Sequence, residues 1–114
     1  MNILGVETAA RTPSGLKGLL MDGPASISLH ASDPTFRGYK SGIYNNLECP
    51  TNVNHAVQAV GWGQDVEAGL NYFIVRNSWG QTWGDKGYIK IAQVNTTLGI
   101  CGMFYRIPTQ PIIA

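Results

Sequence analysis

Two side chains in this 114-residue sequence, a histidine and an asparagine, are of types that support nucleophilic catalysis. His55 begins an apolar run, and Asn77 follows 22 positions later, just before Ser78-Trp79-Gly80. An imidazole can keep a thiol deprotonated and then protonate the departing amine, while a side-chain amide can fix the tautomer and direction of the ring. The spacing alone fixes no distance, and a lone histidine is more often a surface residue or a hydrogen-bonded core residue.

Composition and charge exclude several other classes of function. The net charge is +1 and the basic residues are scattered, so neither nucleic acid nor an anionic membrane is expected as a partner. No apolar stretch approaches the roughly 18 residues of a membrane span, and the first seven residues lack the charged and apolar regions of a signal peptide. Gly61-Trp62-Gly63 is not a dinucleotide fingerprint, because Val66 replaces the third glycine. We expect one domain without a metal or cofactor.

The periodicity predicts a mainly β fold with one short helix. The leucines between Ser14 and Met21 have helical spacing, with Ser14 as the expected cap. In the next strand His30 falls on the polar face and is expected to be solvated or capped, without a function. Antiparallel pairing of the next two strands would bring His55 close to Asn77. The first expected strand, residues 25–30, precedes the turn that Asp33-Pro34 opens. The strands expected after that turn are residues 53–62, 72–77, 87–94 and 103–107.

The chain resembles the C-terminal half of the papain-like cysteine peptidases (the papain and cathepsin family) over residues 14–114, while residues 1–13 have no match. The motifs that carry the resemblance occur in the family's order: Gly23-Pro24, Ser41-Gly42-Ile43-Tyr44, Cys49, the His55 strand, Gly61-Trp62-Gly63, Asn77-Ser78-Trp79-Gly80, Trp83-Gly84, Gly87-Tyr88-Ile89 and Cys101-Gly102. The resemblance implies a bent antiparallel sheet or partial barrel, the right-hand domain of an α+β fold whose helical, Cys-bearing domain is absent here.

The resemblance also implies roles for individual residues. His55 would be the general base and acid, and Asn77 would orient it. Trp79 would cover the bond between them, Trp83 would line the leaving-group side of the cleft, and Ser78 would support the site. The substrate would contact Val53, Asn54, Ala56 and Arg106, with Arg106 either favouring an acidic side chain at the substrate's second residue or turning outward to solvent.

The nucleophile is the part that the sequence does not supply. Cys49 and Cys101 match the family's disulfide positions and not its nucleophile. If they are bonded, closing a loop of roughly 50 residues stabilises the fold by about 4 kcal/mol; the alternative is two free buried thiols. The family's thiol and an oxyanion-hole glutamine are expected upstream, in a Cys-bearing N-terminal domain or chain. We therefore expect half of a peptidase that acts on peptides or proteins and is inactive alone. The alternative is a stand-alone, non-catalytic protein-binding module.

The resemblance further implies a lysosomal, vacuolar or extracellular location, although the chain shows no signal peptide of its own. Asn95-Thr96-Thr97 is an N-glycosylation sequon, and it is usable only if the chain enters the secretory pathway and the loop is exposed. An unmodified Asn95 is the equally open alternative.

Overall fold

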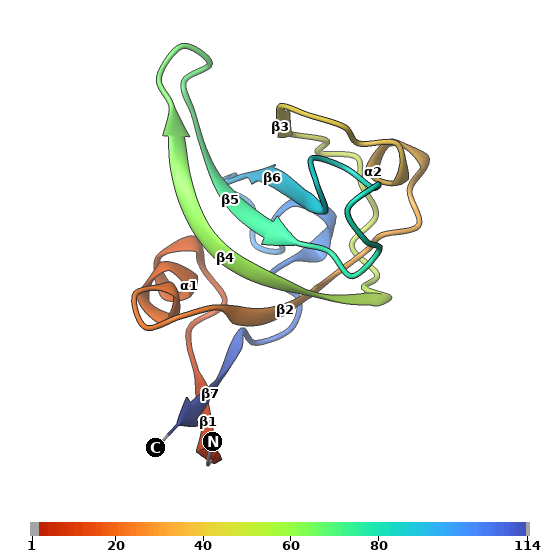
Figure 1. Ribbon diagram of the computed structural model, residues 1–114. Helices are drawn as coiled ribbons and strands as arrows, with labels where there is room; N and C mark the ends of the chain where they lie inside the picture. Colours follow the sequence, from red (N-terminus) through yellow and green to blue (C-terminus); the bar gives the residue numbers. More distant parts are fainter. Residues whose placement is uncertain (1–2, 114) are drawn as a thin grey trace.

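The computed structural model describes residues 3–113, which form one bent seven-stranded sheet with two short helices and one turn of 3-10 helix. The strands are arranged in the order β1-β7-β2-β4-β5-β6-β3, as Figure 1 shows. All neighbouring strands are antiparallel except β3 and β6, which are parallel. The elements are β1 (Ile3–Thr8), α1 (Pro13–Leu20), β2 (Ala25–Leu29), α2 (Pro34–Arg37), β3 (Ile43–Tyr44), β4 (His55–Asp65), β5 (Leu70–Arg76), β6 (Tyr88–Ala92), η1 (Ile100–Gly102) and β7 (Thr109–Ile113).

The long β4–β5 hairpin forms the centre of the sheet and curves strongly (Figure 1). On β4, Val57 and Ala59 are buried while Ala56 and Gln58 are exposed, which is the alternation of a strand with one covered face. The pairing with β5 shifts by one residue between Ala59 and Gly61, so a β-bulge bends the strand at this point. The predicted mainly β, bent sheet is therefore confirmed.

The first and last strands, β1 and β7, form a two-stranded ribbon that leads away from the rest of the sheet (Figure 1). The β1 segment has no counterpart among the family motifs of the sequence, and it pairs with β7 from Ile3↔Ile113 to Thr8↔Thr109. The last strand was predicted over residues 103–107, and this was wrong. Positive φ angles at Gly99, Cys101 and Gly102 turn the chain there, and pairing begins only at Thr109.

Two local features of the helices also differ from expectation. Thr12, and not Ser14, caps α1, because its side chain accepts a hydrogen bond from the Gly15 N–H while Pro13 occupies the first helical position. The segment after Asp33-Pro34 is not only a turn but the helix α2. Asp33 caps it by accepting a hydrogen bond from the Thr35 N–H at 3.0 Å, and Phe36 is buried beneath it.

Of the two settings expected for His30, solvated or capped, the structure shows the second, because its side chain is buried and only 8 % exposed. Its Nδ1 lies 2.9 Å from the carbonyl oxygen of Asn52, so the loop before β4 covers this side chain. A buried imidazole with a backbone partner is a satisfied core residue. Within residues 3–113, no helix combines the length and the apolar character that crossing a membrane requires.

Candidate active site

His55 and Asn77 meet at one end of the central hairpin. His55 is the first residue of β4 and Asn77 directly follows β5, and antiparallel pairing places these two strand ends side by side. The His55 Nε2 atom lies 2.8 Å from Asn77 Oδ1. Asn77 is 5 % exposed, and its N–H donates to the Gly87 carbonyl at 3.0 Å, so the backbone holds the amide in place. The expected proximity is thus confirmed.

A backbone N–H determines the protonation pattern of this pair. The Ser78 N–H, which can only donate, lies 2.7 Å from Asn77 Oδ1, so this oxygen is the acceptor of the amide. His55 Nε2 approaches the same oxygen and must therefore carry the proton. In the neutral ring the lone pair then belongs to Nδ1. The site consequently presents Nδ1 as the atom that can take a proton from a reacting group.

The indole of Trp79 covers the histidine. The two rings are stacked, with centroids 5.2 Å apart and planes inclined by 28°. Trp79 in turn meets Trp83 edge-on at 5.3 Å, and Trp83 stacks on Phe36 of α2 at 5.3 Å. The Trp83 Nε1–H donates to the Arg37 carbonyl at 2.9 Å, which attaches the loop after β5 to α2. The orientation of Trp79 therefore depends on α2, a helix that the sequence pattern did not predict.

The remaining predicted site residues lie in different settings. The Asn54 amide is used within the chain, since its Oδ1 accepts from the Ala31 N–H at 3.0 Å and its Nδ2 donates to Ser32 Oγ at 2.8 Å. Val53 is half-buried and Ala56 is exposed. Arg106 is exposed in the segment between η1 and β7. Their expected contacts with substrate stay predictions.

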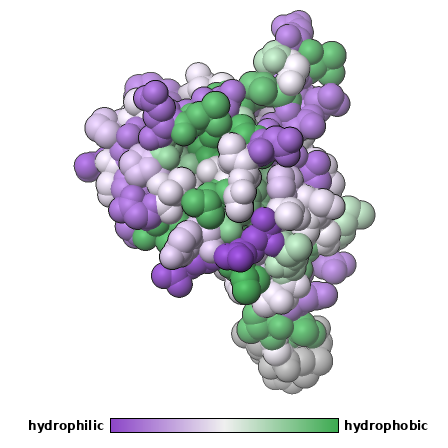
Figure 2. Space-filling view, turned by 180° about the vertical axis from the view of Figure 1, so that it is seen from behind, coloured by the Kyte–Doolittle hydropathy of each residue, from purple (hydrophilic) through white to green (hydrophobic). Residues whose placement is uncertain are grey.

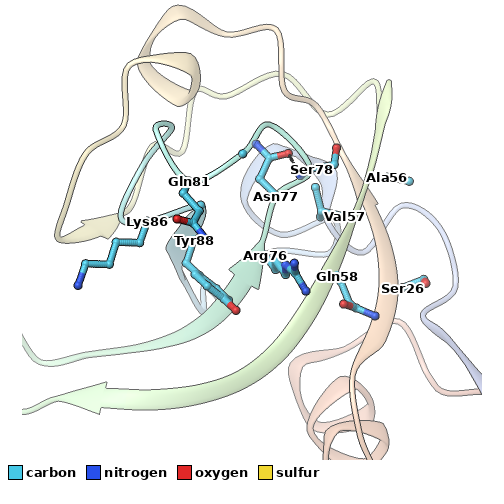
Figure 3. A pocket seen from close by; sticks show the side chains of 12 residues that line it. Ser26, Ala56, Val57, Gln58, Arg76, Asn77, Ser78, Gln81, Lys86 and Tyr88 are labelled. Carbon is cyan, nitrogen blue, oxygen red and sulfur yellow. Dashed lines mark hydrogen bonds between the residues drawn. The ribbon is translucent and has the colours of Figure 1, made fainter.

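A groove of about 580 Å³ begins beside Asn77, and most of it was not anticipated from the sequence. Figure 3 shows Arg76 of β5 and Gln58 of β4 projecting from paired positions into this space. Tyr88 of β6, which pairs with Arg76, and Lys86 extend the lining beyond Arg76. Both charged residues of the lining are cationic, and none is acidic. The signal was present in the strand alternation, because Gln58 faces away from the buried Val57, but only the β4–β5 register pairs it with Arg76.

The cysteines are bonded to one another, as predicted. Cys49 and Cys101 form a disulfide across 52 positions, and both residues are buried. Because the sequence contains only these two cysteines, the chain holds no thiol. Among the described residues, no three His, Cys, Asp or Glu side chains are grouped as a metal site would require.

Comparison with known proteins defines the class to which this site belongs. The sequence profile of the papain family cysteine proteases matches residues 2–107. The chain therefore belongs to the papain family of cysteine proteases. Cathepsin L of Sarcophaga peregrina is 46 % identical over 78 residues, which are 68 % of this chain and 23 % of that protein.

Solved structures extend the similarity to the fold. The bromelain protease of Ananas comosus, solved in complex with an inhibitor, superposes with a TM-score of 0.87 and is 36 % identical in sequence. The superposition covers 98 % of this chain and 51 % of the bromelain chain. The ragweed pollen cysteine protease Amb a 11, solved in its proform, superposes with a TM-score of 0.90 and is 30 % identical. This superposition covers 100 % of this chain and 31 % of the Amb a 11 chain. The chain thus spans less than a quarter of the Sarcophaga relative and about half of the bromelain chain.

Proposed function

We propose that this chain provides the histidine–asparagine half of a cysteine peptidase and that His55 and Asn77 are its catalytic pair. The observation that supports this most directly is the 2.8 Å contact between His55 Nε2 and Asn77 Oδ1 beneath the Trp79 ring. Burial of the amide and the ring cover keep water from competing for this hydrogen bond. A hydrogen bond protected in this way holds the imidazole in one tautomer and one direction.

His55 Nδ1 takes the proton from the thiol that attacks the peptide carbonyl, and the same nitrogen then protonates the departing amine. The carbonyl carbon is transferred to sulfur as the peptide C–N bond breaks, and water later releases the acyl group. While the ring carries both protons, the Asn77 oxygen stabilises the Nε2–H. Ser78 contributes its backbone N–H, which fixes the amide orientation, and Trp83 supports the Trp79 ring on its leaving-group side.

The thiol comes from a Cys-bearing N-terminal domain or chain, since both cysteines here are in the disulfide. The groove beside Asn77 is the place where we expect that partner to dock. Its two cations are uncompensated by any acidic lining residue, and the buried Asn77 Nδ2 has no acceptor among the described atoms. A partner that presents carboxylates to these cations would be favoured, because opposite charges are complementary across an interface.

The substrates are proteins or peptides, and we assign their contacts to the half-buried Val53, to Asn54 and Ala56, and to the exposed Arg106. A guanidinium prefers a carboxylate, so Arg106 favours an acidic side chain at the substrate's second residue. The full protein is expected in a lysosomal, vacuolar or extracellular compartment, in agreement with the buried disulfide, because oxidising compartments are where disulfides persist.

Reconstitution tests this function. The purified chain is refolded with a Cys-bearing N-terminal domain of a papain-family relative, and hydrolysis of a fluorogenic dipeptide amide is measured with and without an epoxide thiol inhibitor. We expect inhibitor-sensitive hydrolysis only in the mixture and none with the matched variant His55→Ala. If two folded halves that bind one another remain inactive, the catalytic proposal is wrong and the chain is a protein-binding module.

A further inference from the structure

The exposed loop between β6 and η1 contains the single Asn-X-Ser/Thr motif of the sequence, Asn95-Thr96-Thr97. All three of its residues are exposed. Both ends of the loop are anchored to the body of the domain. The Gln93 N–H donates to the Asn71 carbonyl at 2.8 Å, and the Phe104 N–H donates to the Leu98 carbonyl at 2.9 Å. The motif therefore protrudes between two fixed points.

We infer that Asn95 is an N-glycosylation site. The inference depends on the secretory compartment proposed above, but not on catalysis. An exposed asparagine in a surface loop can hold an oligosaccharide in the folded protein without displacing core side chains. The Cys49–Cys101 disulfide supports the same compartment independently, because disulfide formation requires an oxidising environment.

The two threonines of the motif have different roles. Thr96 Oγ1 accepts a hydrogen bond from the Gly99 N–H at 3.1 Å, so this hydroxyl is part of the loop's own structure. In the described part of the chain, neither the Asn95 amide nor the Thr97 hydroxyl makes a side-chain hydrogen bond. The asparagine and the hydroxyl that the sequon requires are thus the two groups that the fold does not use.

The modification is a group transfer from a lipid-diphosphate-linked oligosaccharide. Asn95 Nδ2 attacks the first sugar carbon of the donor and an N–C bond forms. The bond from that carbon to the diphosphate oxygen breaks, the lipid diphosphate leaves, and the amide nitrogen loses one proton. No oxidant or reductant takes part in this step.

The position of the loop keeps the oligosaccharide away from the His55–Asn77 pair. In the β5–β6 ladder, Arg76 pairs with Tyr88 next to Asn77, whereas Tyr72 pairs with Ala92 next to the loop. Four strand residues at about 3.4 Å each separate the two ends by about 14 Å. The glycan therefore leaves from the end of β6 that is opposite to the active-site end.

The test translates the full chain behind a cleavable secretory leader in the presence of microsomes, so that entry into the compartment is imposed and no native fold is needed. Occupancy is read from the intact mass of the translocated chain before and after peptide N-glycosidase, which leaves Asp in place of a glycosylated Asn95. The variants are Asn95→Gln and Thr97→Ala, with Thr96→Ala as the matched control that keeps the sequon.

We expect one glycan on the wild type and on Thr96→Ala, and at least about a tenfold lower occupied fraction in the other two variants. A translocated wild-type chain with the mass of the bare polypeptide would overturn the assignment. So would a glycan that persists in Asn95→Gln. Neither result bears on the peptidase activity, which the reconstitution experiment measures separately.

Discussion

The amide oxygen of Asn77 accepts from two donors, and this determines which nitrogen of His55 is available for chemistry. A carboxamide has one acceptor atom and one donor atom. Because the Ser78 N–H can only donate, it fixes which end of the Asn77 amide faces it, and thus the orientation of that amide. The pair is therefore prearranged by the backbone that follows β5. The sequence shows the two residue types, but the role of the Ser78 N–H becomes visible only in the folded loop.

We expect Asn77→Ala to lower kcat/KM of the reconstituted enzyme about a hundredfold, because the ring loses its fixed tautomer and direction while the base itself remains. The measurement is hydrolysis of the fluorogenic amide under first-order conditions. Asn71→Ala, an exposed asparagine at the far end of β5, is the matched control and should retain wild-type activity. If both variants are equally active, Asn77 does not orient His55 and the prediction is wrong.

Among the secondary-structure elements, α2 links the Asp33 cap to the tryptophans of the candidate active site. Asp33 caps the helix, Phe36 is buried beneath it, and Trp83 stacks on Phe36 and supports Trp79. The Thr35 hydroxyl donates a hydrogen bond to the Asp33 carboxylate and is the main reason that the pKa of Asp33 lies below 3.8. Backbone N–H groups lower this pKa further, while partial desolvation of the carboxylate acts in the opposite direction. A carboxylate whose pKa is lowered in the folded state stabilises that state above the unfolded pKa and loses this effect as the pH falls through the folded pKa.

This gives a pH-dependent prediction. The variant Asp33→Asn keeps a capping side chain but cannot titrate, so the wild type should unfold at a higher temperature than the variant near pH 5. The difference should shrink as the pH falls below 3.8, where the carboxylate becomes protonated. Thermal unfolding followed by circular dichroism measures it, with Asp22→Asn as the control carboxylate. A difference that is constant with pH would contradict the argument.

At the scale of the whole molecule, the disulfide joins the loop before β4 to η1. Its 52-residue separation means that it restricts the unfolded chain strongly. We expect the double variant Cys49→Ala, Cys101→Ala to lose about 4 kcal/mol of unfolding free energy in urea titrations. A wild-type sample held in reductant while unfolded should show the same loss. Unchanged stability in both would indicate that the covalent link adds nothing to the fold.

The groove beside Asn77 supplies the second prediction at this scale. If the Cys-bearing half docks there, Arg76→Glu should weaken its binding at least about tenfold, because the cation is replaced by an anion at the interface. The dissociation constant is measured by titration calorimetry against the separate N-terminal half. Lys40→Glu changes an exposed cation that does not line the groove, and it should leave the affinity unchanged.

The sequence by itself determined the family, the mainly β fold and the face on which His55 stands, because strand alternation and ordered motifs are local properties of a chain. It also placed Cys49 and Cys101 at the positions of a disulfide. Other features depended on contacts between distant segments. The Asn52 loop decided that His30 is buried, and the β4–β5 register decided that Arg76 and Gln58 line one groove. Such features depend on contacts between segments that are far apart in the sequence. No local sequence pattern specifies these contacts, and therefore only the folded structure revealed them.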